Sequence, residues 1–548
     1  MPHIDTLGIY GIQDRGEFEY PNFVHDHSLA YFHNGSVEKF VQLERLTRKK
    51  HDNSLQKNLH NLLKENGLIS SSKYDVVFSD NVVGRAFISS DGNMRFEAPL
   101  LHKLENKLEE GKCWWYNKEI KGFVLNHELA HIYSCVPFFG KFKENSLLFH
   151  FDGGASQGNY SAWLYKNGNI ECIEYGWELK YLSAMFNANA LSFAIIGAKH
   201  FDQNSVPGKL MGFGSFGKYS ERLELWLKKN NYFENIWSKK NLFFDKVKND
   251  WGIEIKNFDQ RNSFLQDIAA TFQEIFNRDL IQKVEELKRK TGADYLYYSG
   301  GSALSIVANT LLVEKNLFKD VFIPPCCSDS GLALGAAAAL EIEKEHEVNL
   351  HSPYLCNIGI EEYQVEYTQE TIEAIGSLLI DKKVIGVCNG YGEIGPRALG
   401  NRSILALASS KELADKVSVE HKDREWYRPV APIMLEKNAK YFTGKEEINH
   451  LSKYMLLDFD ILPERQAEIE GVVHINKTSR IQTVYTRDDN PFIYDLLTWL
   501  DSKGVRALIN TSFNKRGEPI VHTEQDAEKS ARNMKLDAVV LNGRLLIL

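Results

Sequence analysis

Residues 162–173 read AWLYKNGNIECI, an apolar strand, an Asn-Gly turn and a second strand. An Asn-Gly pair between two such runs is typical of a tight β-hairpin, because both turn residues must adopt a positive φ. Residues 29–41, LAYFHNGSVEKFV, repeat the pattern, and each copy follows a polar turn that contains Asp and Ser. The repeat predicts a fold with two similar halves facing a cleft. The alternative, two unrelated hairpins, stays open because such hairpins are common.

The middle of the chain contains a predicted domain boundary. Residues 349–367 are polar and contain a proline, which is typical of a linker. Residues 384–388 then have the apolar pattern of a buried strand that opens a new domain. We therefore expect one domain in residues 1–350 and a second in residues 351–548.

The composition is that of an ordinary globular protein. The 548 residues are 43% hydrophobic and 25% charged, with a net charge of -8. Proteins that follow a nucleic-acid backbone usually carry the opposite sign, so no stable nucleic-acid complex is expected. The seven cysteines are scattered and include no C-x-x-C, which argues against a disulfide framework or a cysteine zinc site. The sequence has neither a signal-peptide pattern nor a run of membrane-spanning length, so we expect a cytoplasmic protein without a membrane segment.

His127 and His131 stand four residues apart in the stretch NHELAH. On a helix, their imidazoles project from the same face and can bind one metal ion. The stretch also matches the H-E-x-x-H signature of zinc metallopeptidases, in which Glu128 would be the general base. Such a peptidase needs a third ligand further along the chain. A peptidase zinc site and a different kind of metal site therefore both stay open at this point.

Two glycine-rich turns follow predicted strands. Residues 147–154, LLFHFDGG, form a strand that ends in Asp152 and two glycines. Asp152 is a hard oxygen ligand beside a turn where backbone N–H groups can meet an anion. Residues 299–302, SGGS, follow a second strand and open a helix, whose N-terminus favours phosphate. Asp329 precedes a helix of small residues. The alternative for each is a polar or closely packed turn without a ligand.

The C-terminal part carries four runs of cations in turn-like sequence. Guanidinium groups bind phosphate and carboxylate through paired hydrogen bonds, so these runs in an acidic protein predict a concentrated anion pocket. The alternative is charged loops that are simply solvated. The runs are GPRALGNRS at 395–403, KDREWYRP at 422–429, TSR at 478–480 and NTSFNKRG at 510–517.

Together these motifs resemble the O-carbamoyltransferases of the nodulation-protein, cephalosporin and tobramycin type. The resemblance covers nearly the whole chain. Its matching segments are ERLTRKKH at 44–51, residues 208–217, 329–337, 395–403 and 424–432, and NTSFNKRGEPIV at 510–521.

The resemblance implies an α/β fold with two domains. Residues 1–350 are similar to the actin-like ATPase fold of tRNA threonylcarbamoyl-transfer proteins, and residues 351–548 are similar to YrdC-like domains that form carbamoyl adenylate. Carbamoyl phosphate and ATP, with Mg²⁺, are expected to give carbamoyl adenylate in the second domain. The carbamoyl group then passes in the first domain to an acceptor hydroxyl, and AMP leaves.

The resemblance also implies roles for individual residues. A metal, iron(II) or another divalent ion in vitro, would hold the phosphate of the intermediate through His127, His131, Asp152 and Asp329. Carbamoyl phosphate and the nucleotide would be bound by Gly153, Gly300, Gly301, Arg397, Lys422, Arg428, Arg480 and Ser512. Lys422 and Arg480 would also act in catalysis. His25 and Asp26 would orient or deprotonate the acceptor hydroxyl, and Glu128 would be an incidental neighbour.

The chain departs from the family pattern near the expected acceptor site. Residues 11–24 insert a polar and aromatic stretch, and cysteines stand at 326 and 327 where smaller residues are common. The acceptor therefore stays open between a sugar, a natural product and a hydroxymethyl nucleotide. The general base stays open as well, and a homodimer is one expected assembly. A tRNA threonylcarbamoylation enzyme is a further alternative, against which the net negative charge argues.

Overall fold

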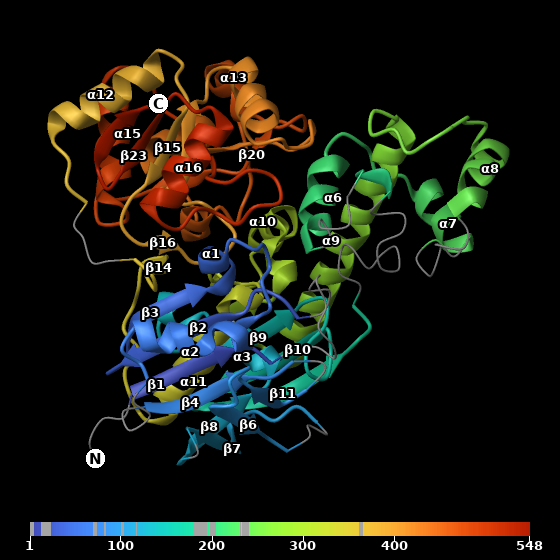
Figure 1. Ribbon diagram of the computed structural model, residues 1–548. Helices are drawn as coiled ribbons and strands as arrows, with labels where there is room; N and C mark the ends of the chain where they lie inside the picture. Colours follow the sequence, from blue (N-terminus) through green and yellow to red (C-terminus); the bar gives the residue numbers. More distant parts are fainter. Residues whose placement is uncertain are drawn as a thin grey trace.

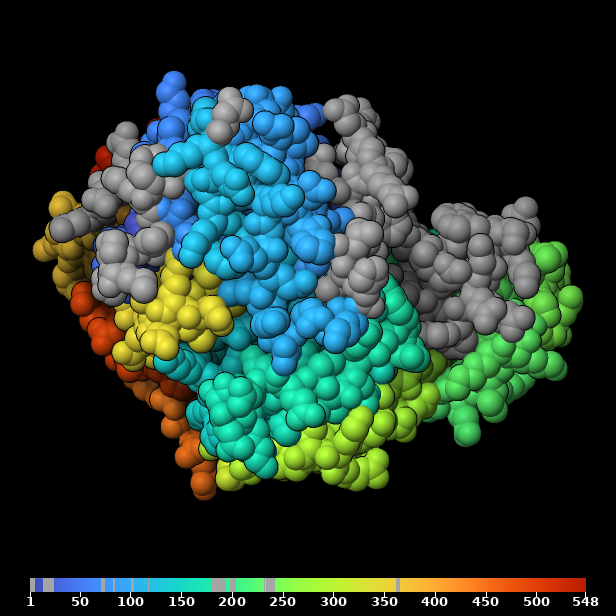
Figure 2. All heavy atoms as spheres, turned by 90° about the horizontal axis from the view of Figure 1, so that it is seen from below, coloured from blue at the N-terminus to red at the C-terminus, as the bar shows by residue number. Residues whose placement is uncertain are grey.

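The computed structural model of the chain describes residues 5–12, 24–69, 74–81, 84–99, 103–116, 118–179, 194–197, 204–230, 232, 240–360 and 365–548. Figure 1 shows the sheets of the N-terminal region, residues 5–360, below the C-terminal region, residues 365–548, with the helices of residues 206–251 to the right of both. Figure 2 gives the view from below, in which α7 (Glu221–Lys229) and α8 (Lys240–Trp251) project from the rest of the molecule.

Two mixed sheets build the N-terminal region. The first has the order β3-β2-β1-β4-β8-β7-β6-β5, and the second has the order β11-β10-β9-β12-β13. Their strands are β1 (Asp5–Tyr10), β2 (Ser28–His33), β3 (Ser36–Gln42), β4 (Tyr74–Ser79), β5 (Ala86–Ile88), β6 (Met94–Glu97), β7 (Glu109–Trp115), β8 (Lys118–Leu125), β9 (Ser146–Phe151), β10 (Tyr160–Lys166), β11 (Asn169–Gly176), β12 (Tyr295–Ser299) and β13 (Asp320–Phe322).

The two sheets share one topology. In the first sheet, β1 pairs antiparallel with the hairpin β2–β3 and parallel with β4, and β4 pairs parallel with β8. In the second sheet, β9 pairs antiparallel with the hairpin β10–β11 and parallel with β12, and β12 pairs parallel with β13. The hairpin turns are Asn34-Gly35, with φ of 49° and 77°, and Asn167-Gly168, with φ of 52° and 74°. These are the angles of the turn that matches strand twist. The predicted duplication is therefore confirmed, and β5–β7 extend only the first copy.

Two helices, α3 (His127–Tyr133) and α11 (Leu332–Glu343), pack against each other in the N-terminal region. Helix α11 also lies on β1, β2 and β4. The approach is close, because a Cβ atom on Gly335 would meet the carbonyl oxygen of Ala130 at 1.8 Å. The run of small residues after Asp329 thus serves helix packing. It also fixes Asp329 next to the first turn of α3.

The C-terminal region is a seven-stranded sheet covered by helices. Its order is β21-β18-β22-β17-β15-β23-β24. The strands are β15 (Ile385–Cys388), β17 (Arg402–Leu407), β18 (Ala431–Leu435), β21 (Gln482–Val484), β22 (Leu508–Ser512), β23 (Ala538–Leu541) and β24 (Arg544–Ile547). The buried strand predicted at 384–388 is confirmed as β15. Part of the predicted linker is instead ordered as β14 (Tyr354–Cys356), because it pairs antiparallel with β16 (Gly392–Glu393).

The remaining helices complete both regions. None in the described part of the chain has the length and apolar character needed to cross a lipid bilayer. They are α1 (Leu43–Thr47), α2 (Leu55–Glu65), α4 (Val136–Phe139), α6 (Val206–Gly214), α7 (Glu221–Lys229), α8 (Lys240–Trp251), α9 (Ser263–Thr291), α10 (Ile306–Glu314), α12 (Gln369–Ile380), α13 (Lys411–Asp415), α14 (Glu436–Thr443), α15 (Pro491–Ser502) and α16 (Glu524–Met534).

Candidate functional site

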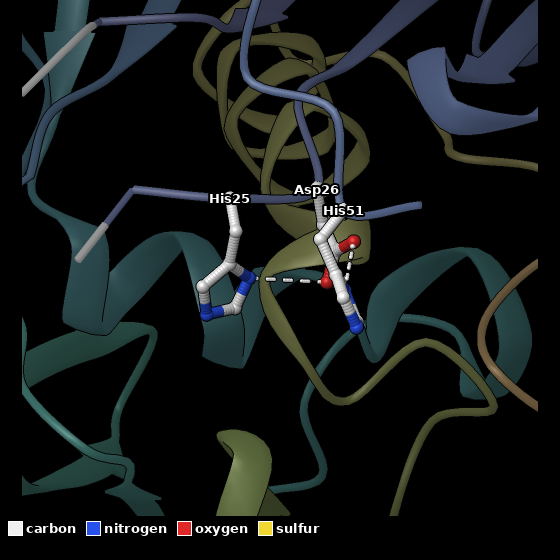
Figure 3. A group of neighbouring side chains, drawn as sticks. All are labelled: His25, Asp26 and His51. Atoms are coloured by element: carbon white, nitrogen blue, oxygen red, sulfur yellow. Dashed lines mark hydrogen bonds and ion pairs between the residues drawn. The ribbon is translucent and has the colours of Figure 1, made fainter. Parts of the chain in front are cut away.

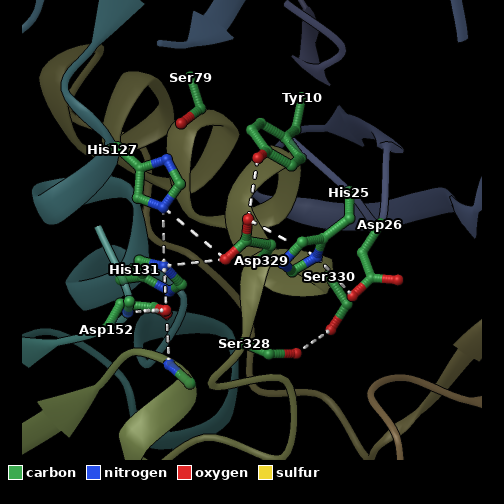
Figure 4. A network of polar contacts seen from close by, with 12 residues as sticks. Tyr10, His25, Asp26, Ser79, His127, His131, Asp152, Ser328, Asp329 and Ser330 are labelled. Carbon is green, nitrogen blue, oxygen red and sulfur yellow. Dashed lines mark hydrogen bonds and ion pairs between the residues drawn. The ribbon is translucent and has the colours of Figure 1, made fainter. Parts of the chain in front are cut away.

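The histidine pair lies on α3, as its spacing predicts. Asn126 caps this helix, and its side chain accepts a hydrogen bond from the N–H of Leu129 at 2.9 Å. His127 and His131 are buried, and their Nε2 atoms lie 3.1 Å apart (Figure 4). Two imidazole nitrogens pointed at one another at this distance suit a shared cation.

Two carboxylates complete the cluster. Oδ1 of Asp329 lies 3.8 Å from Nε2 of His127 and 3.5 Å from Nε2 of His131. Oδ2 of Asp152, which follows β9, lies 3.4 Å from Nε2 of His131. The structure thus brings together all four residues that the resemblance implies as ligands, although they come from three separate parts of the chain. We call them the His–Asp cluster. Two imidazoles and two carboxylates fit a divalent transition metal.

The surroundings of the His–Asp cluster fix its charge state. Burial lowers the pKa of His127 to about 4, which keeps its imidazole neutral, as a metal ligand must be. Burial would raise the pKa of Asp329, but the neighbouring rings of His25, His131 and His127 hold it well below its usual range. The hydroxyl of Tyr10 donates to Oδ2 of Asp329 at 2.9 Å.

Three supporting residues of this site were not predicted. Tyr10 enters from β1, and His150 stacks on His131 with ring centroids 5.1 Å apart. The carbonyl oxygen of Asp80 lies 3.3 Å from Nδ1 of His127, which is the kind of contact that orients a ligating ring. His150 stands two residues before Asp152 on β9, and the period of two along a strand was the available signal. The roles of Tyr10 and Asp80 depend on sheet pairing, which the sequence does not display.

Glu128 contacts the loop after β9. It is fully buried, and its Oε1 accepts a hydrogen bond from the N–H of Gln157 at 2.8 Å. Burial raises the pKa of its carboxyl group. Glu128 therefore holds the loop after β9, and this geometry does not suit the general base of a metallopeptidase.

The glycine turns hold Asp152 rather than presenting free N–H groups. The N–H of Gly301 donates to Oδ2 of Asp152 at 2.5 Å, and the N–H of Gly153 donates to Oδ1. The N–H of Gly300 donates to the carbonyl oxygen of Cys327 at 2.8 Å. Gly300 has a φ of 106° and is close to β9, so a side chain is excluded there. In this arrangement the turns fix a carboxylate of the His–Asp cluster.

His25 and Asp26 lie beside the His–Asp cluster (Figure 4), and His51 lies next to Asp26 (Figure 3). Nδ1 of His25 is 3.1 Å from Oδ2 of Asp26 and 3.9 Å from Oδ2 of Asp329. Nδ1 of His51 is 2.9 Å from Oδ1 of Asp26. Burial would lower the pKa of His25, but the carboxylates of Asp329, Asp26 and Asp152 raise it to about 10.

A second site gathers cations from the C-terminal region and from the loop after α1. Burial, reinforced by neighbouring positive charges, lowers the pKa of Lys422, Arg424 and Arg480 well below the usual range. Nζ of Lys422 donates to the carbonyl oxygen of Asn514 at 2.7 Å. Ser512 accepts from Arg424 at 3.3 Å. We call this group the cation pocket: Lys50, Arg397, Lys422, Arg424, Arg428, Arg480 and Ser512. All five predicted binding residues of the C-terminal region belong to it, and Lys50 and Arg424 are the two members that were not predicted as binding residues.

The charges of the cation pocket favour the binding of an anion. Its guanidinium groups repel one another, and within the described chain Nε of Arg397 and Nε of Arg480 are buried without a hydrogen-bond partner. Such groups are costly to hold together unless an anion binds between them. Nη2 of Arg397 also donates to the carbonyl oxygen of Leu304 at 3.4 Å. Leu304 ends the turn that begins at Gly301, so the cation pocket adjoins the His–Asp cluster.

Two family models match the chain. The model described as "Carbamoyltransferase N-terminus" matches residues 92–338, and the model described as "Carbamoyltransferase C-terminus" matches residues 376–547. Together the two matches cover more than half of the chain.

Individual proteins are similar as well. Full-length HypF, solved in a phosphate- and nucleotide-bound form, is 12% identical with a TM-score of 0.34 over 63% of this chain and 56% of HypF. Nodulation protein NolNO of Sinorhizobium fredii is 27% identical over 96% of this chain and 79% of its own length. An uncharacterized protein of Methanocaldococcus jannaschii is 28% identical over 81% of this chain and 85% of its own length. The similarity in sequence thus extends over nearly all of the chain.

Proposed function

Because this chain belongs to the carbamoyltransferase family, we propose that it is an ATP-dependent O-carbamoyltransferase that works through carbamoyl adenylate. The observation that carries the proposal is the contact between the cation pocket and the turn that holds Asp152. An anion bound among the arginines lies next to a cluster with the donors of a metal site. A two-step reaction with a phosphate-bearing intermediate needs this pair of sites.

The first step takes place in the cation pocket. One water, carbamoyl phosphate and ATP give carbamoyl adenylate, pyrophosphate and inorganic phosphate. Negative charge builds up on the leaving pyrophosphate, and Lys422, Arg428 and Arg480 supply fixed positive charge where it develops. Arg397 and Ser512 help to hold the phosphates. We expect ATP to enter with Mg²⁺.

The second step takes place at the His–Asp cluster. His127, His131, Asp152 and Asp329 would hold iron(II) or another divalent ion, which supplies positive charge for the phosphate of the intermediate. His25 and Asp26 orient the acceptor hydroxyl and take up its proton. The acceptor is a hydroxyl of a sugar, a natural product or a hydroxymethyl nucleotide. We assign an actin-like ATPase domain to residues 1–350 and a YrdC-like domain to residues 351–548.

The test is pyrophosphate release from ATP by the purified enzyme, measured with and without carbamoyl phosphate. We expect release only when both substrates are present, and a loss of at least about 100-fold in Lys422→Ala or Arg480→Ala. Arg532→Ala is the matched control, because Arg532 is an exposed arginine that pairs with Glu528 on α16. Release that ignores carbamoyl phosphate, or that survives both pocket substitutions, would contradict the proposal.

A further inference from the structure

Asp26 lies between two imidazole rings at the edge of the His–Asp cluster (Figure 3). His25 engages Oδ2 of its carboxylate at 3.1 Å, and His51 engages Oδ1 at 2.9 Å. Both oxygens are therefore held, one by each ring. Of these three residues only His51 has no role in the reaction proposed above.

The backbone of this group is strained. Asp26 has a φ of 58° and His51 has a φ of 57°. Residues other than glycine adopt these left-handed angles at a cost, and they keep them where the surrounding structure enforces the conformation. The N–H of His51 donates to Oε2 of Glu44 at 2.9 Å, which fixes the strained turn from the other side. Two residues in this uncommon conformation, joined by one hydrogen bond, indicate a turn that the surrounding structure enforces.

The segment that carries His51 is anchored to the C-terminal region. Nη2 of Arg45 donates to the carbonyl oxygen of Gly395 at 2.9 Å. Nη2 of Arg48 donates to the carbonyl oxygen of Pro519 at 2.9 Å. His51 follows these anchors directly, so its ring is placed by the packing of the two regions and not by its own loop alone.

We propose that His51 is a positioning residue for carbamoyl transfer, which holds Asp26 so that Asp26 can orient the ring of His25 toward the acceptor hydroxyl. The inference rests on the proposed function, because it assigns a role within the second step. Asp26 accepts the Nδ1 proton of His25. A cation bound by Asp329 and Asp152 would offset two of the carboxylates that raise the pKa of His25, so that its Nε2 can carry a lone pair in the metal-loaded enzyme.

The transfer step follows from this tautomer. Nε2 of His25 takes the proton of the acceptor hydroxyl while the hydroxyl oxygen bonds to the carbamoyl carbon. The bond from that carbon to the AMP oxygen breaks, and its electron pair leaves with AMP. Asp26 stays ionised, since both of its oxygens accept hydrogen bonds, and it stabilises the imidazolium that forms.

The experiment compares three variants of the full-length, metal-loaded enzyme. His51→Leu removes the donor, whereas His51→Asn keeps an N–H at the position of Nδ1. His33→Leu is the matched control, since Nδ1 of His33 binds Asp5 at 2.8 Å at the far end of β2. Pyrophosphate reports the first step. AMP released with water and glycerol as nucleophiles reports the second.

We expect His51→Leu to lower kcat for AMP release by about 10- to 100-fold, the range typical of groups that orient a functional histidine. The burst of pyrophosphate should be unchanged, His51→Asn should recover activity to within about threefold of the wild type, and His33→Leu should have no effect. Equal loss in both steps, or an asparagine variant as slow as the leucine variant, would overturn the proposal. A wild-type enzyme that releases no pyrophosphate would instead refute the proposed function.

Two further measurements keep the inference testable without turnover. Selective ¹⁵N labelling of histidine, assigned with a His25→Asn variant, should report the Nδ1–H tautomer of His25 in the wild type and in His51→Asn. That signal should be lost in His51→Leu. Metal analysis should give the same content in all three variants. A second equivalent of metal that disappears in His51→Leu would assign the three residues to metal binding and refute the positioning role.

Discussion

Replacing Arg480 with methionine should raise the free energy of unfolding of the anion-free protein. It should also reduce the stabilisation that a bound anion provides. In the structure, Nε of Arg480 is a buried donor without a partner among the described residues. Arg397, Arg424 and Arg428 lie close enough to lower its pKa further than burial alone. Methionine has a similar length and removes both the unpaired donor and the repulsion.

The size of the effect follows from these two terms. A buried donor left unpaired costs about 1–3 kcal/mol, so the variant should gain about 1–2 kcal/mol in the absence of ligand. For a region of this size that equals a rise in Tm of about 2–8 °C. Pyrophosphate at about 100 times its Kd should stabilise the wild type by about 2.7 kcal/mol. The variant should gain much less, so the order of the two Tm values reverses.

Thermal unfolding with and without sodium pyrophosphate measures both the gain in stability of the ligand-free variant and the stabilisation by pyrophosphate. Arg532→Met is the control, because Arg532 is exposed and paired with Glu528, and it should leave the pyrophosphate shift unchanged. The reasoning fails if Arg480→Met melts below the wild type without ligand, or if pyrophosphate raises the Tm of both proteins equally.

Three further outcomes are expected. Asp329→Ala should lower the affinity for metal by more than about 100-fold, the upper end of the losses seen when a residue behind a ligand is changed. Metal analysis measures this loss, and pyrophosphate release should continue. Glu128→Gln should retain metal and AMP release within about twofold, because a neutral amide can still accept from Gln157; loss of activity would revive the peptidase interpretation. Burial lowers the pKa of His522 to about 3, so the folded protein binds fewer protons than the unfolded chain between about pH 6.5 and 3. Stability is therefore lost as pH falls through that window, and His522→Gln should flatten this dependence in urea unfolding.

The sequence predicted what depends on short-range patterns. The Asn-Gly turns revealed the two hairpins because their backbone angles require such residues, and pairing then made the sheets alike. The spacing of His127 and His131 revealed a shared helix face. The cations of the C-terminal region were found because they stand in Gly- and Ser-rich turns. Each of these signals lies within a dozen residues.

What stayed hidden depends on contacts between distant segments. His51 ends the charged run 44–51, which matched the family pattern without a role for His51. Only the pairing of β1 with β2 and the anchoring of α1 bring it to Asp26. The partners of the glycine turns also depend on contacts between distant segments. The sequence cannot tell whether the N–H of Gly301 is free, and the structure shows it bound to Asp152. Nucleotide binding by Gly153, Gly300 and Gly301 therefore stays a prediction.

The opposite charges of the cation pocket and the His–Asp cluster predict which of the two proposed steps requires the metal. The proposed intermediate, carbamoyl adenylate, carries a negative phosphate, which the cation pocket would attract. Asp152 and Asp329 would repel that phosphate, by about 1 kcal/mol for each charge at 4 Å even in water and by more in a buried site. A divalent ion between the carboxylates and the histidines would cancel the negative charge of the two carboxylates and present a positive centre to the phosphate. Metal should therefore be required for AMP release and not for pyrophosphate release. A chelated enzyme that still forms pyrophosphate but stops before AMP would separate the two steps.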